Sequence, residues 1–225
     1  MKLHDSVEMH DRIAEDYAKI LMSEKSRVYA QEIAKILPIK NGDVVLDVGA
    51  GAGRIAQAVL DEYDISKYYA VEPSELYKNF MVKDPRLELL KELGQDLSLP
   101  DNCCDVAFAE QVIIHIKKDD IVKEIISEMG RVVKPGGYVA LTTTQCFSEI
   151  PIRILEVLGK KDHYFKTAVK TSAGEDVYAY RRYFSVKEIK EFLENAGVKL
   201  VSMFPEKRLL GVFPYYYHIL AKSLK

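Results

Sequence analysis

An acidic residue followed by three glycines at alternate positions forms the segment "DVGAGAG", residues 47–53. The residues before it favour a strand, and those after it have the apolar spacing of a helix. Dinucleotide-binding turns follow the pattern GxGxxG, whereas Gly53 here falls one position earlier than the third glycine of that pattern. Asp47 would repel a pyrophosphate, and it suits a ligand that carries positive charge. The segment therefore predicts a nucleotide-like ligand with a cationic group, and it disfavours NAD.

Two more acidic residues follow predicted strands at positions where a nucleoside could be bound. Glu72 ends "YYAVE", and a carboxylate at this point can accept hydrogen bonds from both ribose hydroxyls. Asp96, in "GQDLSLP", can accept a hydrogen bond from an adenine amino group, with Leu97 against the ring. Each residue alone also fits an ordinary strand end or turn. Together with the glycine turn, they predict a ligand that contains adenosine.

The elements that must position these residues alternate between strands and helices. After the first strand in "DVVLDVG", apolar strand candidates lie at 67–72, 87–92, 105–110 and 138–144. Such an alternation predicts a parallel sheet that is covered by helices on both faces. The segment "SVKEIKEFLENAG" predicts a late helix with a capping box, and two closing strands follow in "VKLVSMF" and "FPYYYHILAKS".

The length of 225 residues predicts a single domain, residues 1–225. Within it we expect a helical N-terminal cap (1–38), a cofactor-binding core (43–144), a substrate-facing insertion (145–184), and a C-terminal helix with closing strands (185–225). The insertion is longer than an ordinary connection, which suggests a lid.

The composition limits the kinds of partner that we expect the protein to bind. A formal net charge of -2 gives no overall attraction for nucleic acid or anionic membranes. The sequence shows no apolar run typical of a signal peptide or a membrane span, so we expect a cytoplasmic protein. Cys103 and Cys104 are adjacent and Cys146 is distant, which matches neither a disulfide framework nor metal-ligand spacing. We therefore expect reduced thiols and no metal.

Several segments together resemble the class I S-adenosylmethionine-dependent methyltransferases, in particular the type 11-like methyltransferase-domain group that acts on small molecules. In chain order they are "VVLDVGAGAGRIA", "YYAVEPS", "GQDLSLP", "DVAFAEQVIIHI" and "MGRVVKPGGYVALTT". The resemblance covers roughly residues 40–144, and the last 40 or so residues also look like the end of this family. It implies an α/β, Rossmann-like, doubly wound sheet of seven mostly parallel strands, with helices on both faces and the last strand antiparallel.

The resemblance also implies that S-adenosyl-L-methionine is the cofactor and S-adenosyl-L-homocysteine the product. Asp47 and the loop 49–53 would hold the methionine part, and Glu72 the ribose. Pro73 would pack near the adenine, Asp96 would take its amino group, and the Leu97 amide would face the ring. The complete set of implied cofactor-binding residues is Tyr17, Asp47, Gly49, Ala50, Gly51, Gly53, Glu72, Pro73, Asp96, Leu97, Glu110 and Gln111.

Methyl transfer from a sulfonium needs mainly an aligned, desolvated acceptor. An oxygen or nitrogen acceptor that is protonated at the working pH also needs a base. His115, in "EQVIIHIKKDD", is the candidate that the family pattern places near the floor of the site, and His163 is a second choice. A histidine between isoleucines also fits a structural role.

Four alternatives remain open at this point. The methyl acceptor is either a small molecule, which we favour, or an RNA or protein bound by a basic rim in the insertion, where acidic residues nearly balance the basic ones. A cluster at 178–183, with three tyrosines and two arginines, fits contact with an aromatic or phosphate substrate, and a surface role fits it at least as well. A non-catalytic cofactor-binding scaffold and an NAD-dependent enzyme are the other readings. The sequence is compatible with a monomer or a homodimer.

Overall fold

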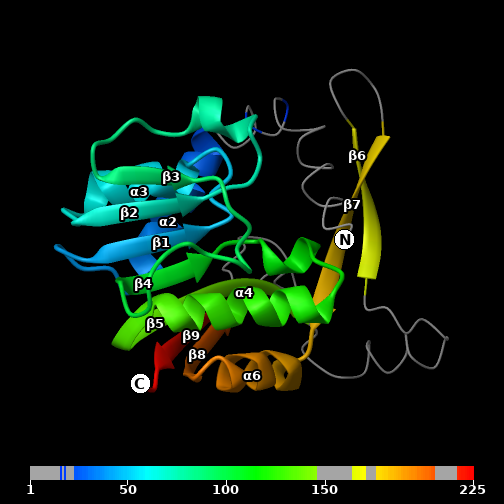
Figure 1. Cartoon of the computed structure of the whole chain (residues 1–225). Helices are drawn as coiled ribbons and strands as arrows, with labels where there is room; N and C mark the ends of the chain where they lie inside the picture. Colours follow the sequence, from blue (N-terminus) through cyan, green and yellow to red (C-terminus); the bar gives the residue numbers. More distant parts are fainter. Residues whose placement is uncertain (1–15, 17, 19–22, 146–163, 171–175, 206–216) are drawn as a thin grey trace.

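The computed structural model describes residues 16, 18, 23–145, 164–170, 176–205 and 217–225. The central path of the sheet has the strand order β3-β2-β1-β4-β5, and β9 and then β8 continue it beyond β5 (Figure 1). Their bounds are β1 Val44–Val48, β2 Lys67–Val71, β3 Leu87–Leu90, β4 Cys104–Ala109, β5 Val133–Gln145, β8 Val198–Pro205 and β9 Tyr217–Ser223. Of these seven strands, β9 runs opposite to the other six, which confirms the predicted fold class.

Helices cover both faces of the sheet (Figure 1). On one face, α2 (Glu24–Ile36) and α3 (Arg54–Glu62) pack over β1, β2 and β4 through a buried apolar cluster. On the other, α4 (Asp119–Val132) and α6 (Val186–Asn195) enclose a second cluster. Two short 3-10 helices, η1 (Tyr77–Phe80) and η2 (Ile113–His115), follow β2 and β4. The alternation of strands and helices therefore produces the expected three layers.

The start of α6 has the capping geometry that its sequence predicts. The Ser185 side chain accepts from the Glu188 amide at 3.1 Å, and the Glu188 carboxylate accepts from the Ser185 amide at 2.8 Å. Gly197 follows the helix with a φ of 70°, the left-handed conformation that a glycine adopts without strain. Both ends of this helix are thus fixed by local sequence.

The predicted insertion contributes a hairpin to the fold. Strands β6 (Tyr164–Lys170) and β7 (Asp176–Phe184) pair antiparallel, and β7 pairs in parallel with the last two residues of β5. The hairpin extends beyond the carboxyl ends of the sheet strands, on the side where ligands bind in open parallel sheets (Figure 1). The prediction that this segment faces a substrate stays a prediction.

Arg182 anchors the base of this hairpin. Its side chain is 4% exposed, donates to Asp119 at the start of α4, and lies 3.0 Å from Glu188 Oε1 in α6. The sequence grouped Arg182 with residues available to a substrate phosphate. That expectation is wrong for this side chain, because two carboxylates already hold it in the interior.

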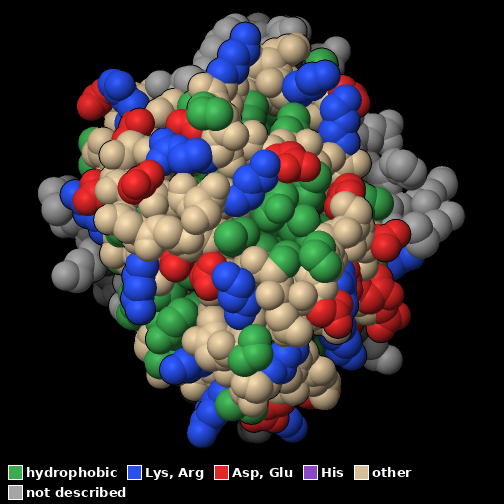
Figure 2. Space-filling view, turned by 60° about the vertical axis from the view of Figure 1, so that its left-hand side comes forward, with side chains coloured by type: hydrophobic (Ala, Val, Ile, Leu, Met, Phe, Trp, Pro, Cys, Tyr) green, Lys and Arg blue, Asp and Glu red, His purple; other side chains and the backbone are tan. Residues whose placement is uncertain are grey.

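The face of the molecule shown in Figure 2 carries acidic and basic side chains side by side, around a group of hydrophobic ones. Intermingled charges of both signs produce only a weak net field over a surface. This face therefore lacks the one-signed potential that attracts a nucleic acid backbone.

Candidate functional site

A row of polar side chains crosses the sheet at the carboxyl ends of its strands. The register pairs Asp47 with Ala70 and Phe108, and Phe108 with Ala140. Side chains alternate along a strand, so the residues two positions further along lie on the same face of the sheet. These residues are Glu72, Glu110 and Thr142, and His218 on β9 lies opposite Thr142. We call Glu72, Glu110, Thr142 and His218 the polar row. Asp47 on β1 is level with the residues two positions before this row.

Asp47 is buried beneath the polar row. Its side chain accepts a hydrogen bond of 2.8 Å from the hydroxyl of Tyr68, which is itself fully buried. Burial raises the pKa of Asp47 to about 7; the Tyr68 hydrogen bond opposes this, and the nearby carboxylates of Glu72 and Glu110 add to it. Three carboxylates close enough to influence one another favour a cationic ligand, because such a ligand relieves their mutual repulsion.

Glu72 is held by main-chain amides on both of its oxygens. Gly51 N–H donates to Oε2 at 2.8 Å, and Ser74 N–H donates to Oε1 at 2.9 Å. A carboxylate offers about four acceptor positions, so each oxygen can accept another hydrogen bond. The side chain is thereby oriented to receive two neighbouring hydroxyls, as the ribose prediction requires.

The three glycines of the turn have different surroundings. A Cβ on Gly49 would lie 2.4 Å from a methyl of Val112, and one on Gly53 would lie 2.6 Å from the sulfur of Met81. Among the residues that the structure describes, none lies within 4 Å of a Cβ on Gly51, although the φ of 53° is left-handed. Gly49 and Gly53 therefore serve packing, whereas Gly51 exposes its backbone to open space where a ligand can approach.

Arg54 contributes a positive charge that the sequence did not single out as a site residue. It is the first residue of α3, donates to Ser26 Oγ at 3.2 Å, and lies 4.8 Å above the ring of Tyr29. It also lowers the pKa of Asp47, so it stands near that carboxylate. A guanidinium at a helix N-terminus can bind a carboxylate, such as that of a methionine part.

The two residues predicted to contact the adenine differ in their surroundings. Asp96 is exposed after β3, where its carboxylate is accessible to a ligand. The Leu97 amide instead donates to Glu128 Oε2 of α4 at 3.0 Å, and the Leu97 side chain is 6% exposed in the core. This N–H already has an acceptor, and the expected contact between the amide and an adenine ring stays a prediction.

Glu110 and Gln111 end β4 and turn toward α2. Glu110 accepts hydrogen bonds from the hydroxyls of Tyr29 and Thr142, and the Gln111 amide lies 3.3 Å from Tyr29 Oη. Gln111 has a φ of 58°, a left-handed conformation that costs a residue with a side chain about 1–2 kcal/mol. Such strain at a strand end is typical of functional sites. That these residues line the floor of the site stays a prediction.

His218 and Thr142 complete the row, and neither was a sequence candidate. His218 Nδ1 lies 3.2 Å from Thr142 Oγ1 and 4.0 Å from Glu110 Oε2. Beside them is a small pocket, lined by α2 and by β4, β5, β8 and β9, that includes Ile33, Ile36 and Phe204. No short motif marks these residues, because their proximity depends on the pairing of β5 with β9.

The remaining candidates lie elsewhere. Pro73 is half-buried after β2, and Ala50 is 9% exposed, with its amide 3.0 Å from the Val71 carbonyl. His115 ends η2, beyond β4, and its role as a base stays a prediction. Tyr17 and His163 lie outside the described residues.

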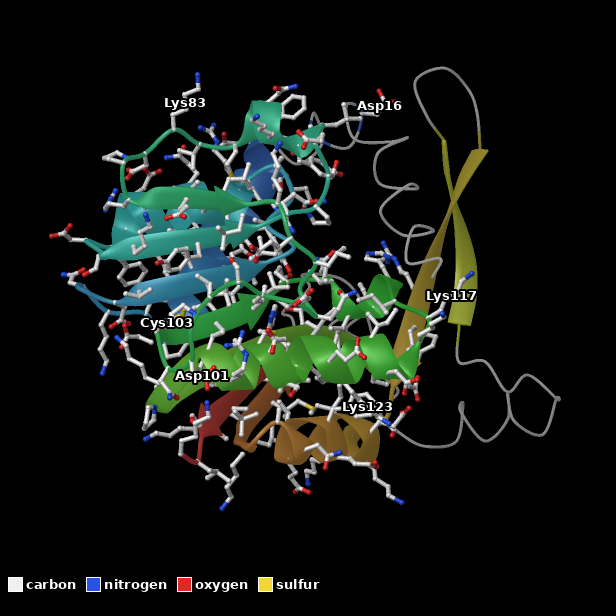
Figure 3. All side chains as sticks on the ribbon, viewed as in Figure 1. Asp16, Lys83, Asp101, Cys103, Lys117 and Lys123 are labelled. Atoms are coloured by element: carbon white, nitrogen blue, oxygen red, sulfur yellow. The ribbon has the colours of Figure 1, made fainter. Side chains whose placement is uncertain are left out.

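The adjacent cysteines are far from this site. Figure 3 shows Cys103 at the amino end of β4, whereas Lys117 lies at the opposite end of the sheet, toward the hairpin. The two sulfurs are 3.5 Å apart, and burial raises the pKa of the Cys104 thiol. A neutral buried thiol is a poor nucleophile, which fits a structural role.

Comparison with known proteins identifies the domain. Residues 46–141 match the family described as "Methyltransferase domain", a span that holds Asp47, Glu72, Asp96 and Glu110. The chain carries a class I S-adenosylmethionine-dependent methyltransferase domain. This agrees with the resemblance in the sequence and leaves the NAD-dependent alternative without support.

Relatives of this methyltransferase domain differ in what they are named for. An uncharacterized methyltransferase of Mycobacteroides abscessus is 34% identical over 46% of this chain and 40% of its own length. A tRNA (carboxymethyluridine(34)-5-O)-methyltransferase of Arabidopsis thaliana is 27% identical over 60% of this chain and 31% of its own. The chain thus spans less than half the length of these curated relatives.

Among solved structures, the methyltransferase domain is similar to a chain in the complex between the Haloferax volcanii Trm112 methyltransferase activator and a methyltransferase. The TM-score is 0.69 at 17% identity, over 95% of this chain and 96% of that one. At this identity the likeness supports the fold alone. None of the helices that the structure describes is long and apolar enough to cross a membrane.

Proposed function

We propose that the protein transfers the methyl group of S-adenosylmethionine to a small-molecule acceptor. The observation that carries the proposal is the pairing of buried Asp47, coupled to Glu72 and Glu110, with the open space at Gly51. A ligand that is cationic at one end and a nucleoside at the other fits this arrangement. When bound, S-adenosylmethionine supplies a methyl group that is electrophilic because it is attached to a sulfonium.

Each end of the cofactor has a partner in this proposal. Asp47 attracts the ammonium group, and Arg54 binds the carboxylate of the methionine part. Glu72 accepts from the two ribose hydroxyls, and Asp96 accepts from the adenine amino group. The loop 49–53 lets the ligand approach the backbone at Gly51. The protein thereby orients the donor, which is the main requirement for this type of displacement.

A small acceptor fits the charges better than RNA does. The net charge is -2, and acidic residues nearly balance the basic ones in the insertion 145–184. RNA binding normally depends on a strong basic surface. Because one relative is named as a tRNA methyltransferase, RNA is the second candidate acceptor. One structural neighbour is a chain in complex with a methyltransferase activator, so the same assays also test whether activity requires a partner protein.

Isothermal titration with S-adenosylmethionine, S-adenosylhomocysteine and NAD tests the proposal. The two sulfur compounds should bind and NAD should not. Glu72→Ala should weaken binding by a factor of about 10 to 150, which corresponds to about 1.5–3 kcal/mol for hydrogen bonds to a charged group. Glu75→Ala is the matched control, because Glu75 is exposed and pairs only with solvent-accessible Lys91 among the contacts the structure describes for its side chain.

If neither sulfur compound binds the wild-type protein, the proposed function is wrong. If both bind but Glu72→Ala binds as tightly as Glu75→Ala in a folded protein, the ribose assignment is wrong and the rest of the proposal survives. A wild-type protein that binds the cofactor and methylates only RNA would replace the small-molecule acceptor with the second candidate.

A further inference from the structure

The hydrogen bonds around Thr142 determine which nitrogen of His218 carries the proton. Thr142 has one hydroxyl hydrogen, and it points to the Glu110 carboxylate, which can only accept when it is ionised. The Thr142 oxygen, 3.2 Å from His218 Nδ1, must then receive the hydrogen of Nδ1. Nδ1 of His218 therefore carries a hydrogen, and when the ring is neutral Nε2 has an electron pair that can accept from another donor.

The surroundings keep His218 neutral near neutral pH. The residue is 8% exposed, and the Phe204 ring of β8 lies 5.5 Å from its ring. Burial lowers the pKa of His218, and the charge of Glu110 opposes this effect. Within the described part of the chain, the titratable groups that face the imidazole are Glu110, just after β4, and, through Glu110, Tyr29 from α2.

Glu110, Thr142 and His218 lie next to Asp47 and Glu72, the residues that hold the cofactor in the proposed function. Glu110 is close enough to Asp47 to raise its pKa, so the two halves meet at Glu110. On the other side, the pocket beside His218 is lined by apolar side chains of α2, including Ile33 and Ile36, and by Phe204. The pocket has a volume of about 20 Å³, which is room for a water-sized group, so it fits the hydroxyl or amine of an acceptor and not the acceptor's whole body.

We infer that His218 accepts the proton of the methyl acceptor, and that Thr142 and Glu110 position it for that role. The inference rests on the proposed function and adds a substrate class to it, namely a molecule whose nucleophile is a hydroxyl or an amine. An acceptor without a transferable proton would have no use for this arrangement.

The proton and the electrons balance in this step. The nucleophile forms a bond to the methyl carbon, the carbon–sulfur bond breaks, and its electron pair stays on the sulfur. The proton of the nucleophile passes to His218 Nε2. Glu110 stabilises the resulting imidazolium through Thr142, as a carboxylate does for a histidine base in hydrolases. The proton then leaves to water, which restores the neutral imidazole.

Nitrogen-15 NMR of the histidine rings in the protein saturated with S-adenosylhomocysteine tests the positioning role. The wild-type protein should show His218 neutral at pH 7 with hydrogen on Nδ1. Thr142→Val, which keeps the shape and removes the hydroxyl, should move the hydrogen partly or wholly to Nε2. Thr143→Val is the matched control, because its side chain is on the other face of β5, and it should leave the His218 signals unchanged.

The same samples test the acceptor site with 4-propylphenol as a probe and propylbenzene as its counterpart without a hydroxyl. The phenol should shift the His218 Nε2 signal, and propylbenzene should not. His218→Asn retains a donor for Thr142 and should bind S-adenosylhomocysteine within twofold of the wild type, but isothermal titration should show that it binds the phenol more weakly than the wild type does. His115→Asn should keep both properties.

Hydrogen on Nε2 in the wild-type protein would overturn the inference, because Nε2 could not accept a proton. The same conclusion follows if 4-propylphenol at millimolar concentration leaves the His218 signals unchanged, or if the phenol response depends on His115 instead. A tautomer that does not change in Thr142→Val would remove the positioning role. These outcomes are separate from failure of the proposed function, which is measured by S-adenosylhomocysteine binding to the wild type.

Discussion

The two halves of the polar row are built from different kinds of interaction. In the β1–β2 half, Glu72 is held by main-chain amides 2 and 21 residues away in sequence. In the β4–β9 half, Glu110 and Thr142 depend on side chains, with partners 81 residues away at Tyr29 and 76 residues away at His218. The first half is thus a product of local backbone geometry, and the second is assembled by the tertiary fold.

This difference has a functional consequence. Main-chain amides are present whatever the side chains are, so a site that depends on them tolerates sequence change around it. A cluster of side chains changes its chemistry with any one substitution. We therefore expect the β1–β2 half to bind the common cofactor, and the β4–β9 half to be the part that selects the acceptor.

The substitution Gly51→Ala should weaken cofactor binding by the β1–β2 half more than the other substitutions do. The added Cβ would occupy the open space where the ligand approaches the backbone. Inserting a group into a filled site costs about 1–3 kcal/mol, so Gly51→Ala should weaken S-adenosylhomocysteine binding on the order of 100-fold, measured by isothermal titration.

Gly42→Ala provides the control for backbone strain. Gly42 also has a left-handed φ, of 87°, with nothing within 4 Å of an added Cβ, but it lies before β1 at the opposite end of the strand. Both variants should lose about 1–2 kcal/mol of stability, and only Gly51→Ala should lose affinity. Equal affinities for the two variants would show that the cofactor does not contact this turn.

Asp47→Asn should have an intermediate effect that depends on pH. The folded pKa of Asp47, about 7, lies above its ordinary value, so the folded state binds the proton more tightly than the unfolded state does. The contribution of Asp47 to the free energy of unfolding is therefore fully present below its ordinary pKa, and it is lost as the pH rises toward 7. The advantage of Asp47→Asn in thermal unfolding of the ligand-free protein should therefore grow from about pH 4 to about pH 7.

Ligand binding should depend on pH in the opposite sense. A cationic ligand favours the ionised carboxylate, so wild-type affinity should rise between pH 5.5 and about pH 7 with release of a proton. Asp47→Asn should lack this dependence and bind on the order of tenfold more weakly at pH 7.5, the factor that about 1.4 kcal/mol represents. Titration in buffers with different ionisation enthalpies measures the proton release, and its absence in the wild type would contradict the assignment.

Tyr29→Phe should produce the smallest change in cofactor binding. The substitution keeps the ring beneath Arg54 and removes the hydroxyl that donates to Glu110. Loss of this hydrogen bond and of the longer one that Gln111 donates to the hydroxyl should lower the stability by about 1–2 kcal/mol and leave S-adenosylhomocysteine affinity within about threefold of the wild type.

Tyr63→Phe is the counterpart for this variant, because the Tyr63 hydroxyl donates to the Ala34 carbonyl at 3.3 Å, away from the polar row. The two variants should have similar unfolding midpoints. A tenfold or greater loss of cofactor affinity in Tyr29→Phe alone would show that the two halves are not separate sites.

The sequence by itself determined the succession of motifs along the chain, the glycine turn, and the acidic residues at the ends of β1 and β2. These features are readable because each depends on neighbours in the chain: a strand ends, a turn needs glycine, and a carboxylate follows. The capping box of α6 and the left-handed Gly197 are predictable for the same reason.

Only the tertiary structure decided the other half of the site. Thr142 meets His218 because β9 pairs antiparallel with β5, and Tyr29 meets Glu110 because α2 packs on that face. The structure also gave the Leu97 amide to Glu128 and buried Arg182 between two carboxylates. Hydrogen bonds between residues far apart in sequence depend on register and helix packing, and the packing of the whole chain fixes both.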